Sequence, residues 1–314
     1  MFVQLAMLES ARCIDEEALD DAWGWVRAAN RSGGHSSHRG CIIHGLVGMS
    51  IHATATAGMA RWAEQPHVTS GQLKAALAEL KADYSMYESE SNILRAEYLM
   101  GRNTLLMWPD VENTDNIQRS ATAKGVIKMG FWIVGEPELS LRIHRQVLAN
   151  QIREFDKPAA RRRRLAGYGS AMFFDPDPLV RRVPGQLDQS GIKRGLQRSY
   201  VAHALIPDVK RFEMSQLWQA GRQATIEVVL AAQAYRRDHG EFPTTLQQLV
   251  PDYLGSVPLD PCDSNGGPLL YRRDDVVKAV VWSVGDDGVD SGGTVVAPAN
   301  ALPADVGFEF KLAQ

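Results

Sequence analysis

The residues best suited to chemistry lie in an acidic, glycine-rich loop at positions 283–293. Side-chain oxygens come from Ser283, Asp286, Asp287 and Asp290, and the glycines between them allow backbone carbonyls to turn inward. Closely spaced oxygen ligands of this kind are what Ca²⁺ requires. We therefore predict a candidate calcium site at these four residues, although no glutamate closes the loop as in an EF-hand. The alternative is a solvated turn whose aspartates accept hydrogen bonds from backbone amides.

A second candidate for metal binding is a group of histidines around Cys41. It consists of His35, His38, His44 and His52. On a helix, Cys41, His44 and His52 would share one face, so two or three ligands could converge there. No carboxylate completes the set at a fixed spacing, and the HExxH motif is absent. Surface or helix-packing histidines are the favoured interpretation, and a metal-dependent enzyme is kept as an alternative.

Other patterns do not predict a reaction. Ser170 lacks the second glycine and the preceding strand of a nucleophile elbow. The glycines after Asn265 are not followed by the lysine and helix of a phosphate-binding loop. The basic run 161–164 is interpreted as a solvated face, and a net charge of −3 provides no attraction to nucleic acid. We expect a non-enzymatic protein with a protein partner and no nucleic acid.

The composition is that of a soluble globular protein, with 45% hydrophobic and 23% charged residues. The three cysteines form no CxxC pair and are interpreted as isolated thiols. The apolar stretch Met1–Leu8 has no basic region before it, so it does not resemble a signal peptide. The best membrane candidate, Cys41–Ala60, contains histidines and many small polar residues. We expect a soluble chain as given, attached to a membrane only through a missing N-terminal anchor.

Helical periodicity dominates the first half of the chain, which is predicted as an all-helical domain over residues 1–156, either a bundle or an irregular helical array. A break is predicted at 30–34, where two glycines are adjacent. The small residues Gly45, Gly48 and Gly58 predict a close approach between helices. Helices are predicted over residues 16–29, 40–64, 69–81, 86–107 and 137–155.

The second half combines a helix with strands. Residues 157–194 are rich in proline, arginine and glycine and are predicted as a connector. A long helix follows to residue 239, where Gly240 and Pro243 end it. Strands are predicted over 268–272 and 276–284, the second apolar on both faces and hence central or covered. The predicted fold class is α+β, with a long helix packed on a small antiparallel sheet in residues 195–314.

The C-terminal region resembles the soluble part of type II secretion major pseudopilins, in four sequence blocks of matching order and spacing. The blocks are Tyr235-x2-Asp238-x-Gly240-x-Phe242-Pro243-x-Thr245, Pro258-x-Asp260-Pro261, Pro268-Leu269-x-Tyr271 and Ser283-Val284-Gly285-x-Asp287-Gly288. The resemblance implies a long helix on an antiparallel sheet, calcium in the acidic loop, and an assembly subunit at the cell envelope. The whole chain also resembles planctomycete-type proteins that join a helical region to a pseudopilin-like module.

Two departures from the family modify that expectation. A pseudopilin starts with a cleavage site and an apolar membrane helix, whereas here mostly helical, soluble sequence comes first. The start of the long helix, with Lys210, Arg211 and Glu213, is too polar to span a membrane. Assembly into a pilus is therefore not expected. We predict a structural or interaction protein of the cell envelope; the alternative is a helical-array protein that binds a peptide or protein and uses the C-terminal module as a cap.

Overall fold

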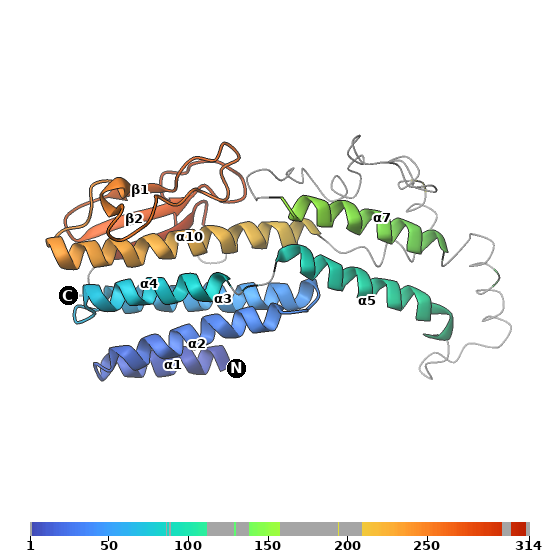
Figure 1. The fold of residues 1–314 in the computed structure, drawn as a ribbon, viewed down its shortest axis with the longest axis horizontal. Coiled ribbons are helices and arrows are strands. Elements are labelled where there is room, and N and C mark those ends of the chain that lie inside the picture. The colour runs from blue at the N-terminus through green and yellow to red at the C-terminus, as the bar shows by residue number, and fades with distance from the viewer. Residues whose placement is uncertain are drawn as a thin grey trace.

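A helix of 31 residues, α10 (Val209–His239), runs between a layer of helices and a small sheet (Figure 1). The structure is a computed structural model and describes residues 2–85, 87, 89–111, 129, 138–157, 194, 209–296 and 303–311. Its other main elements are α1 (Phe2–Asp15), α2 (Leu19–Ser37), α3 (Ile42–Glu64), α4 (Ser70–Ser85), α5 (Glu90–Val111), α7 (Glu138–Phe155), the 3-10 helix η3 (Leu246–Leu249), β1 (Leu270–Arg273), β2 (Lys278–Ser283) and β3 (Val306–Lys311). The fold class is α+β, as predicted.

Helices α2 and α3 cross at two glycines. A Cβ atom on Gly33 would lie 2.8 Å from the carbonyl oxygen of Gly48, and one on Gly48 would lie 2.6 Å from that of Gly33. The close approach predicted from the small residues of α3 is confirmed here. The predicted break at 30–34 is wrong, because α2 continues through it to Ser37. Of the two glycines that suggested a break, Gly33 instead allows the two helix backbones to touch, and Gly34 leaves room for the Tyr87 ring.

The sheet is an antiparallel meander in the order β1-β2-β3. Strand β2 is central and almost wholly buried, as its apolar sequence predicted. The prediction placed its start too early, because Val276 and Val277 are exposed and lie in the turn before Lys278. Strand β3 was not predicted, although Val306, Phe308 and Phe310 alternate with polar or small residues. That alternation is the usual signal of a half-buried strand.

Helix α10 is buried along both sides. The sheet and α10 pack together, and α3 and α4 cover the opposite side of the helix (Figure 1). One hydrophobic cluster includes Trp62 and Leu73 of the helical layer, Val229 of α10 and Phe310 of the sheet. Between residues 226 and 234 α10 is apolar around most of its circumference, which is typical of a helix in a core. The helical layer and the sheet therefore share this core. The domain boundaries predicted at residues 157 and 194 lie next to or within residues that the structure does not describe, and they stay a prediction.

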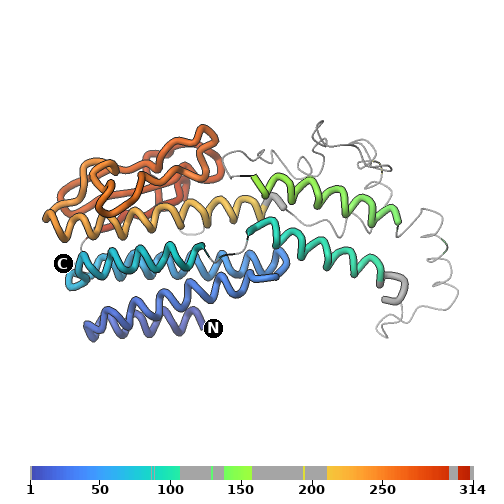
Figure 2. The backbone as a smooth tube through the Cα atoms, viewed as in Figure 1, coloured from blue at the N-terminus to red at the C-terminus, as the bar shows by residue number. Residues whose placement is uncertain are grey.

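Helices α5 and α7 extend the molecule beyond the N-terminal end of α10. Figure 2 shows them side by side, away from the sheet. Phe155 of α7 packs on Phe212 of α10, with ring centroids 5.6 Å apart. These rings and Ile42, Met49 and Ile93 belong to a second hydrophobic cluster. This cluster connects the helical pair to the remainder of the fold.

Arg237 ties the C-terminal end of α10 to the turn between α3 and α4. Its guanidinium donates to the carbonyl oxygens of Ala63 (3.1 Å), Gln65 (2.8 Å) and Val68 (3.0 Å). The last carbonyls of a helix have no partner within it, and the helix dipole favours a cation there. Burial lowers the pKa of Arg237 to about 10, which still leaves it charged at neutral pH. Helix α10 therefore supplies the C-terminal cap of α3.

Two further contacts reinforce this junction. Asp238 Oδ2 accepts hydrogen bonds from Ser70 Oγ (2.9 Å), Lys74 Nζ (3.0 Å) and Tyr253 OH (2.7 Å). The tyrosine hydroxyl and then the lysine hold the pKa of Asp238 below its usual value. Asp238 belongs to the first pseudopilin-like block, and two of its three donors come from α4.

Replacing Arg237 with lysine is expected to lower the free energy of unfolding by about 2–3 kcal/mol, because one ammonium group cannot reach three divergent carbonyls. Equilibrium denaturation in urea measures this loss. The neighbouring Arg236→Lys is the control, since Arg236 lies over the Phe242 ring at 5.5 Å and lysine keeps that cation–π contact. Equal losses in the two variants would contradict the capping role.

Candidate functional site

The predicted calcium ligands lie on one loop but are directed to different partners. Asp286 Oδ1 accepts a hydrogen bond from Trp218 Nε1 at 2.8 Å. Asp290 Oδ1 accepts one from Trp282 Nε1 at 2.9 Å. Asp287 Oδ1 accepts one from the Val289 amide within the loop. Each of the three carboxylates has a second oxygen, Oδ2. The loop would have to bring these three oxygens together for them to bind one cation.

Ser283 is the predicted ligand that lies deepest in the fold. Its side chain is fully buried, and its hydroxyl donates to Asp260 Oδ1 at 2.6 Å. The other oxygen of Asp260 accepts from the Val284 amide at 2.8 Å. The Ser283 hydroxyl thus serves to hold the strand end against Asp260. It does not point to the loop carboxylates as a ligand set would require.

Two buried aspartates organise the loop. Asp260 is 2% exposed and Asp305 is fully buried. Asp305 accepts hydrogen bonds from the amides of Ser291 (3.1 Å), Gly293 (2.9 Å) and Thr294 (2.9 Å). A carboxylate that accepts several backbone N–H groups is well satisfied without a cation. Asp260 and Asp305 therefore fix the two ends of the acidic loop. Neither aspartate was among the predicted ligands.

The described residues contain no group of three or more His, Cys, Asp or Glu side chains placed to hold a metal ion. The four predicted histidines belong to no such group. His52 is buried, His44 is exposed and lies 3.2 Å from Cys41 Sγ, and His35 and His38 are at the end of α2. The calcium site and the histidine site both stay predictions, since binding could order ligands that are apart in the free protein.

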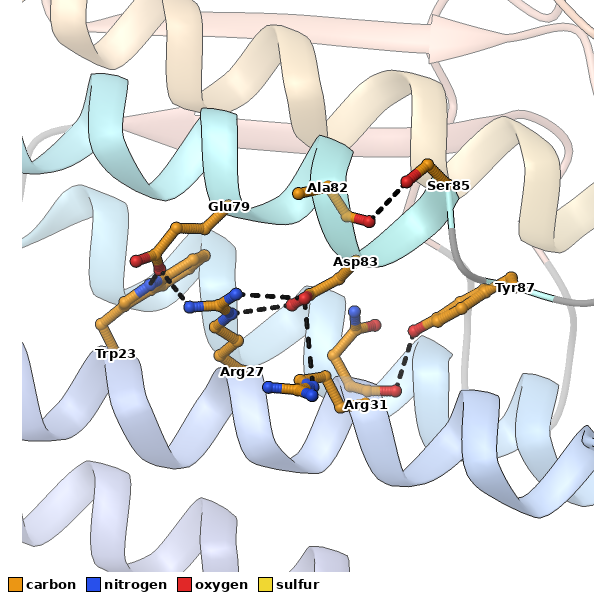
Figure 3. A network of polar contacts seen from close by, with 9 residues as sticks. Trp23, Arg27, Arg31, Glu79, Ala82, Asp83, Ser85 and Tyr87 are labelled. Atoms are coloured by element: carbon orange, nitrogen blue, oxygen red, sulfur yellow. Dashed lines mark hydrogen bonds and ion pairs between the residues drawn. The ribbon is translucent and has the colours of Figure 1, made fainter.

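A polar network joins α2 to α4, as Figure 3 shows. Arg27 donates to both oxygens of Asp83, at 2.7 and 3.1 Å, and pairs with Glu79 at 2.9 Å. Trp23 Nε1 also donates to Glu79, at 2.8 Å. Asp83 is 1% exposed, so this bidentate pair is largely removed from solvent. The hydrogen bonds that Arg27 donates to Asp83 raise the pKa of Arg27.

A cavity of about 110 Å³ lies at the end of this network, between α2, α3, α10 and the segment that joins α4 to α5. Its wall combines amide, hydroxyl and backbone groups. The lining residues are Gly33, Gly34, Ser37, Gly45, Gly48, Met49, Tyr84, Tyr87, Glu90, Ile93, Gln216, Gln219 and Gln223. The three glutamines recur at helical spacing along α10 and so face the cavity together.

Unpaired buried polar atoms lie close to this cavity. Tyr84 lines it, and its hydroxyl has no hydrogen-bond partner among the described residues. Just behind, His52 Nδ1 lies 2.7 Å from Asn30 Oδ1, while His52 Nε2 and Asn30 Nδ2 also lack described partners. Buried polar groups are rarely left without a partner, and they mark places where a ligand or ordered water belongs. This cavity is the best-built candidate binding site in the described residues.

Sequence interpretation missed this cavity because its residues come from distant segments. Its only signal was the repetition of glutamine at positions 216, 219 and 223 along α10. The glycines at 45 and 48 were noted, but as packing residues. They do pack, since a Cβ atom on Gly45 would meet Ile93 and Phe212 at 3.1 Å and one on Gly48 would meet the Gly33 carbonyl at 2.6 Å.

The comparisons with known proteins identify no relative. No family model, no curated protein and no solved structure matches the chain. Within the part of the chain that the structure describes, no helix combines the length and apolar character needed to cross a membrane. The pseudopilin-like resemblance therefore rests on the four sequence blocks alone.

Millimolar Ca²⁺ is expected to raise the melting temperature of the protein, and Asp287→Asn with Asp290→Asn is expected to remove the shift, because a ligand that binds only the native state stabilises it. Thermal denaturation with Ca²⁺ or with a chelator measures this. Asp275→Asn, in the β1–β2 turn, is the matched control, since Asp275 makes a similar bond to the Val277 amide. No shift in the unmodified protein would mean that the loop aspartates only shape the turn.

Lowering the pH from 7 to 5 is expected to cost about 2 kcal/mol of stability through His52 alone. Burial, and next the charge of Arg222, lower the pKa of His52 to about 3, whereas an unfolded histidine titrates near 6.5. The unfolded chain therefore binds the proton first, and stability falls as the pH drops below 6.5. Denaturation of His52→Gln at both pH values should lack this loss, while the exposed variant His35→Gln should retain it.

Proposed function

We propose that this protein is a non-enzymatic structural or interaction protein of the cell envelope, built on a pseudopilin-like module. The support comes from the long helix packed on an antiparallel meander, which is the arrangement that the four-block resemblance implies. Several block residues have structural roles here: Gly240 ends α10 with a positive φ of 84°, and the Tyr271 hydroxyl donates to the Pro243 carbonyl.

The observation that carries the proposal is the double-sided burial of α10. A subunit that assembles with copies of itself through α10 would need one side of this helix to be exposed. Residues 211–239 expose no large hydrophobic side chain, and α3 and α4 occupy the side that the sheet leaves free. The helical layer therefore acts as a built-in partner of the module, which favours a role in binding another protein over polymerisation.

The helical layer also offers an apolar surface for such a partner. Phe2, Leu5 and Leu8 recur along one face of α1 and are 51%, 53% and 66% exposed. Large apolar side chains grouped on a surface are typical of interaction sites. The alternative of a helical array with an open peptide groove is less favoured, because one hydrophobic cluster packs α2, α3, α4 and α10 together. The cavity of about 110 Å³ between these helices is too small for a peptide.

A photoreactive amino acid at Leu8 is expected to form one saturable cross-linked product in the cells that express the protein. Leu5→Gln should reduce its yield by about tenfold, since burying a leucine contributes roughly 1.5 kcal/mol to a contact. Gel analysis and fractionation of the cell envelope measure the product and its location.

The matched control places the same probe at Val276, which is 55% exposed in the β1–β2 turn on the other side of α10. The same product from both positions would mean nonspecific capture. The absence of a product at Leu8, or its recovery only outside the envelope fraction, would contradict the proposal.

A further inference from the structure

The exposed face of α1 changes from apolar to acidic along its length. Phe2, Leu5 and Leu8 are 51%, 53% and 66% exposed and occupy the first two turns. Asp15 follows Leu8 by seven residues, so it lies on the same side of the helix two turns further on. It is exposed and pairs with no residue in the described part of the chain. A partner of this face must therefore match an apolar stretch with a negative end.

Acidic side chains are concentrated at the end of α1 and in the turn to α2. Residues 9–21 contain six acidic residues and a single basic one, Arg12. The six are Glu9, Asp15, Glu16, Glu17, Asp20 and Asp21. Arg12 is already paired with Glu9 at 2.8 Å and with Glu16 at 2.6 Å. The charge that this end of α1 offers to a partner is therefore negative.

A surface hollow lies at this acidic end, between the α1–α2 turn and the start of α4. Carboxylates of Glu17, Asp20 and Asp21 line it, and His67 is the only basic residue among those that line it. Gln72 of α4 donates to Asp20 at 2.6 Å, which connects the two sides of the hollow. A lysine or arginine side chain suits such a place, because it combines an apolar stem with a cationic tip.

The position of α1 leaves its outer face to a partner. The helix lies at the edge of the helical layer farthest from the sheet, where it packs on α2 and α3 (Figure 1). It contributes Ala6, Ser10 and Cys13 to the interior, and these residues lie on the side opposite the exposed apolar ones. A second helix matches a narrow stripe of this kind, because packed helices interlock side chains spaced by three or four residues.

We propose that the outer face of α1 binds an amphipathic helix of a partner protein, whose apolar residues pack on Phe2, Leu5 and Leu8 and whose basic residues reach the acidic turn. This inference rests on the interaction role proposed above and names the chemistry of the partner. The acidic end disfavours two other occupants. It repels an anionic lipid surface, and α1 of a second copy has no basic segment to meet it.

Fluorescence anisotropy on the full chain tests this with a labelled peptide of about 14 residues that carries leucines on one helical face and lysines on the other. Saturable binding is expected. Raising the salt concentration from about 20 to 300 mM should weaken it at least about threefold, because ions screen the attraction between exposed charges. A peptide of the same composition in scrambled order, and one with glutamate in place of lysine, should not bind.

Leu8→Gln is expected to weaken binding of the leucine–lysine peptide by about tenfold, because it removes one buried leucine from the contact. Ile43→Gln is the matched control, since Ile43 is 68% exposed on α3 and lies outside this face. It should bind the peptide as the unmodified protein does. Urea denaturation confirms that both variants are folded.

Asp15→Asn combined with Asp21→Asn should weaken binding by about fivefold and reduce its dependence on salt, because both changes remove charge from the acidic end. The matched control is Asp252→Asn with Asp275→Asn, which removes the same charge from exposed positions in the C-terminal module. Its effect on affinity and on the salt dependence should be much smaller.

Equal binding of the scrambled or the glutamate peptide would overturn the proposal, as would unchanged binding in Leu8→Gln. A dimer that Leu8→Gln dissociates in sedimentation velocity would identify a second copy as the occupant. Flotation with vesicles of phosphatidylglycerol and phosphatidylcholine, lost in the same variant, would identify a lipid surface. If the peptide does not bind while the Leu8 cross-link still forms in cells, the partner chemistry is wrong and the interaction role stands. Peptide binding without that cross-link would instead contradict the role in the cell.

Discussion

The contact between the Arg237 guanidinium and the C-terminal end of α3 is the interaction on which the architecture depends. It binds the carbonyl of Ala63 in the last turn of α3 and those of Gln65 and Val68 in the turn that follows, and it does so from a helix that also carries the sheet. A planar group with several donors suits this task better than a lysine. Because the same helix continues into Asp238, which α4 approaches through Ser70 and Lys74, the end of α10 orients both α3 and α4. Helices α3 and α4 are thus held in one defined position against α10.

Buried polar groups have two distinct roles in this fold. Asp305 accepts from backbone amides, and Asp260 accepts from backbone amides and the Ser283 hydroxyl, so both specify loop positions at little cost. The group around Tyr84, His52 and Asn30 retains unpaired atoms next to a cavity. The first kind of site rigidifies the sheet edge. At the second kind of site, buried donors and acceptors lack a described partner. The acidic loop differs, because its buried aspartates are already hydrogen-bonded.

Sequence reasoning was reliable where one local rule acted alone. A helix was predicted from residue 69, and the Thr69 hydroxyl does accept from the Gln72 amide while the Gln72 side chain accepts from the Thr69 amide. It failed where a tertiary contact overrode the local rule, as at Gly33, whose neighbour Gly48 is close in space but not in sequence. Strand β3 was recognisable from its alternation and was overlooked. The cavity could not be predicted, because its walls come from four segments. The aspartates of the acidic loop have the composition of ligands, and composition alone does not reveal which oxygens already accept from an indole or an amide.

Because Glu64 of α3 pairs with strand β3, the N-terminal helices complete their contacts only late in the synthesis of the chain. Glu64 Oε1 accepts from the Lys311 amide at 3.0 Å, and Gln233 Nε2 donates to the Lys311 carbonyl at 2.9 Å, so one residue of β3 is held by both α3 and α10. The first of these bonds closes a separation of 247 residues. During translation α3 emerges from the ribosome long before β3, and its apolar face must wait for α10 and the sheet. A long delay of this kind exposes hydrophobic surface to other chains. We therefore expect the nascent chain to be most prone to aggregation after its N-terminal helices have been made and before β3 has been made.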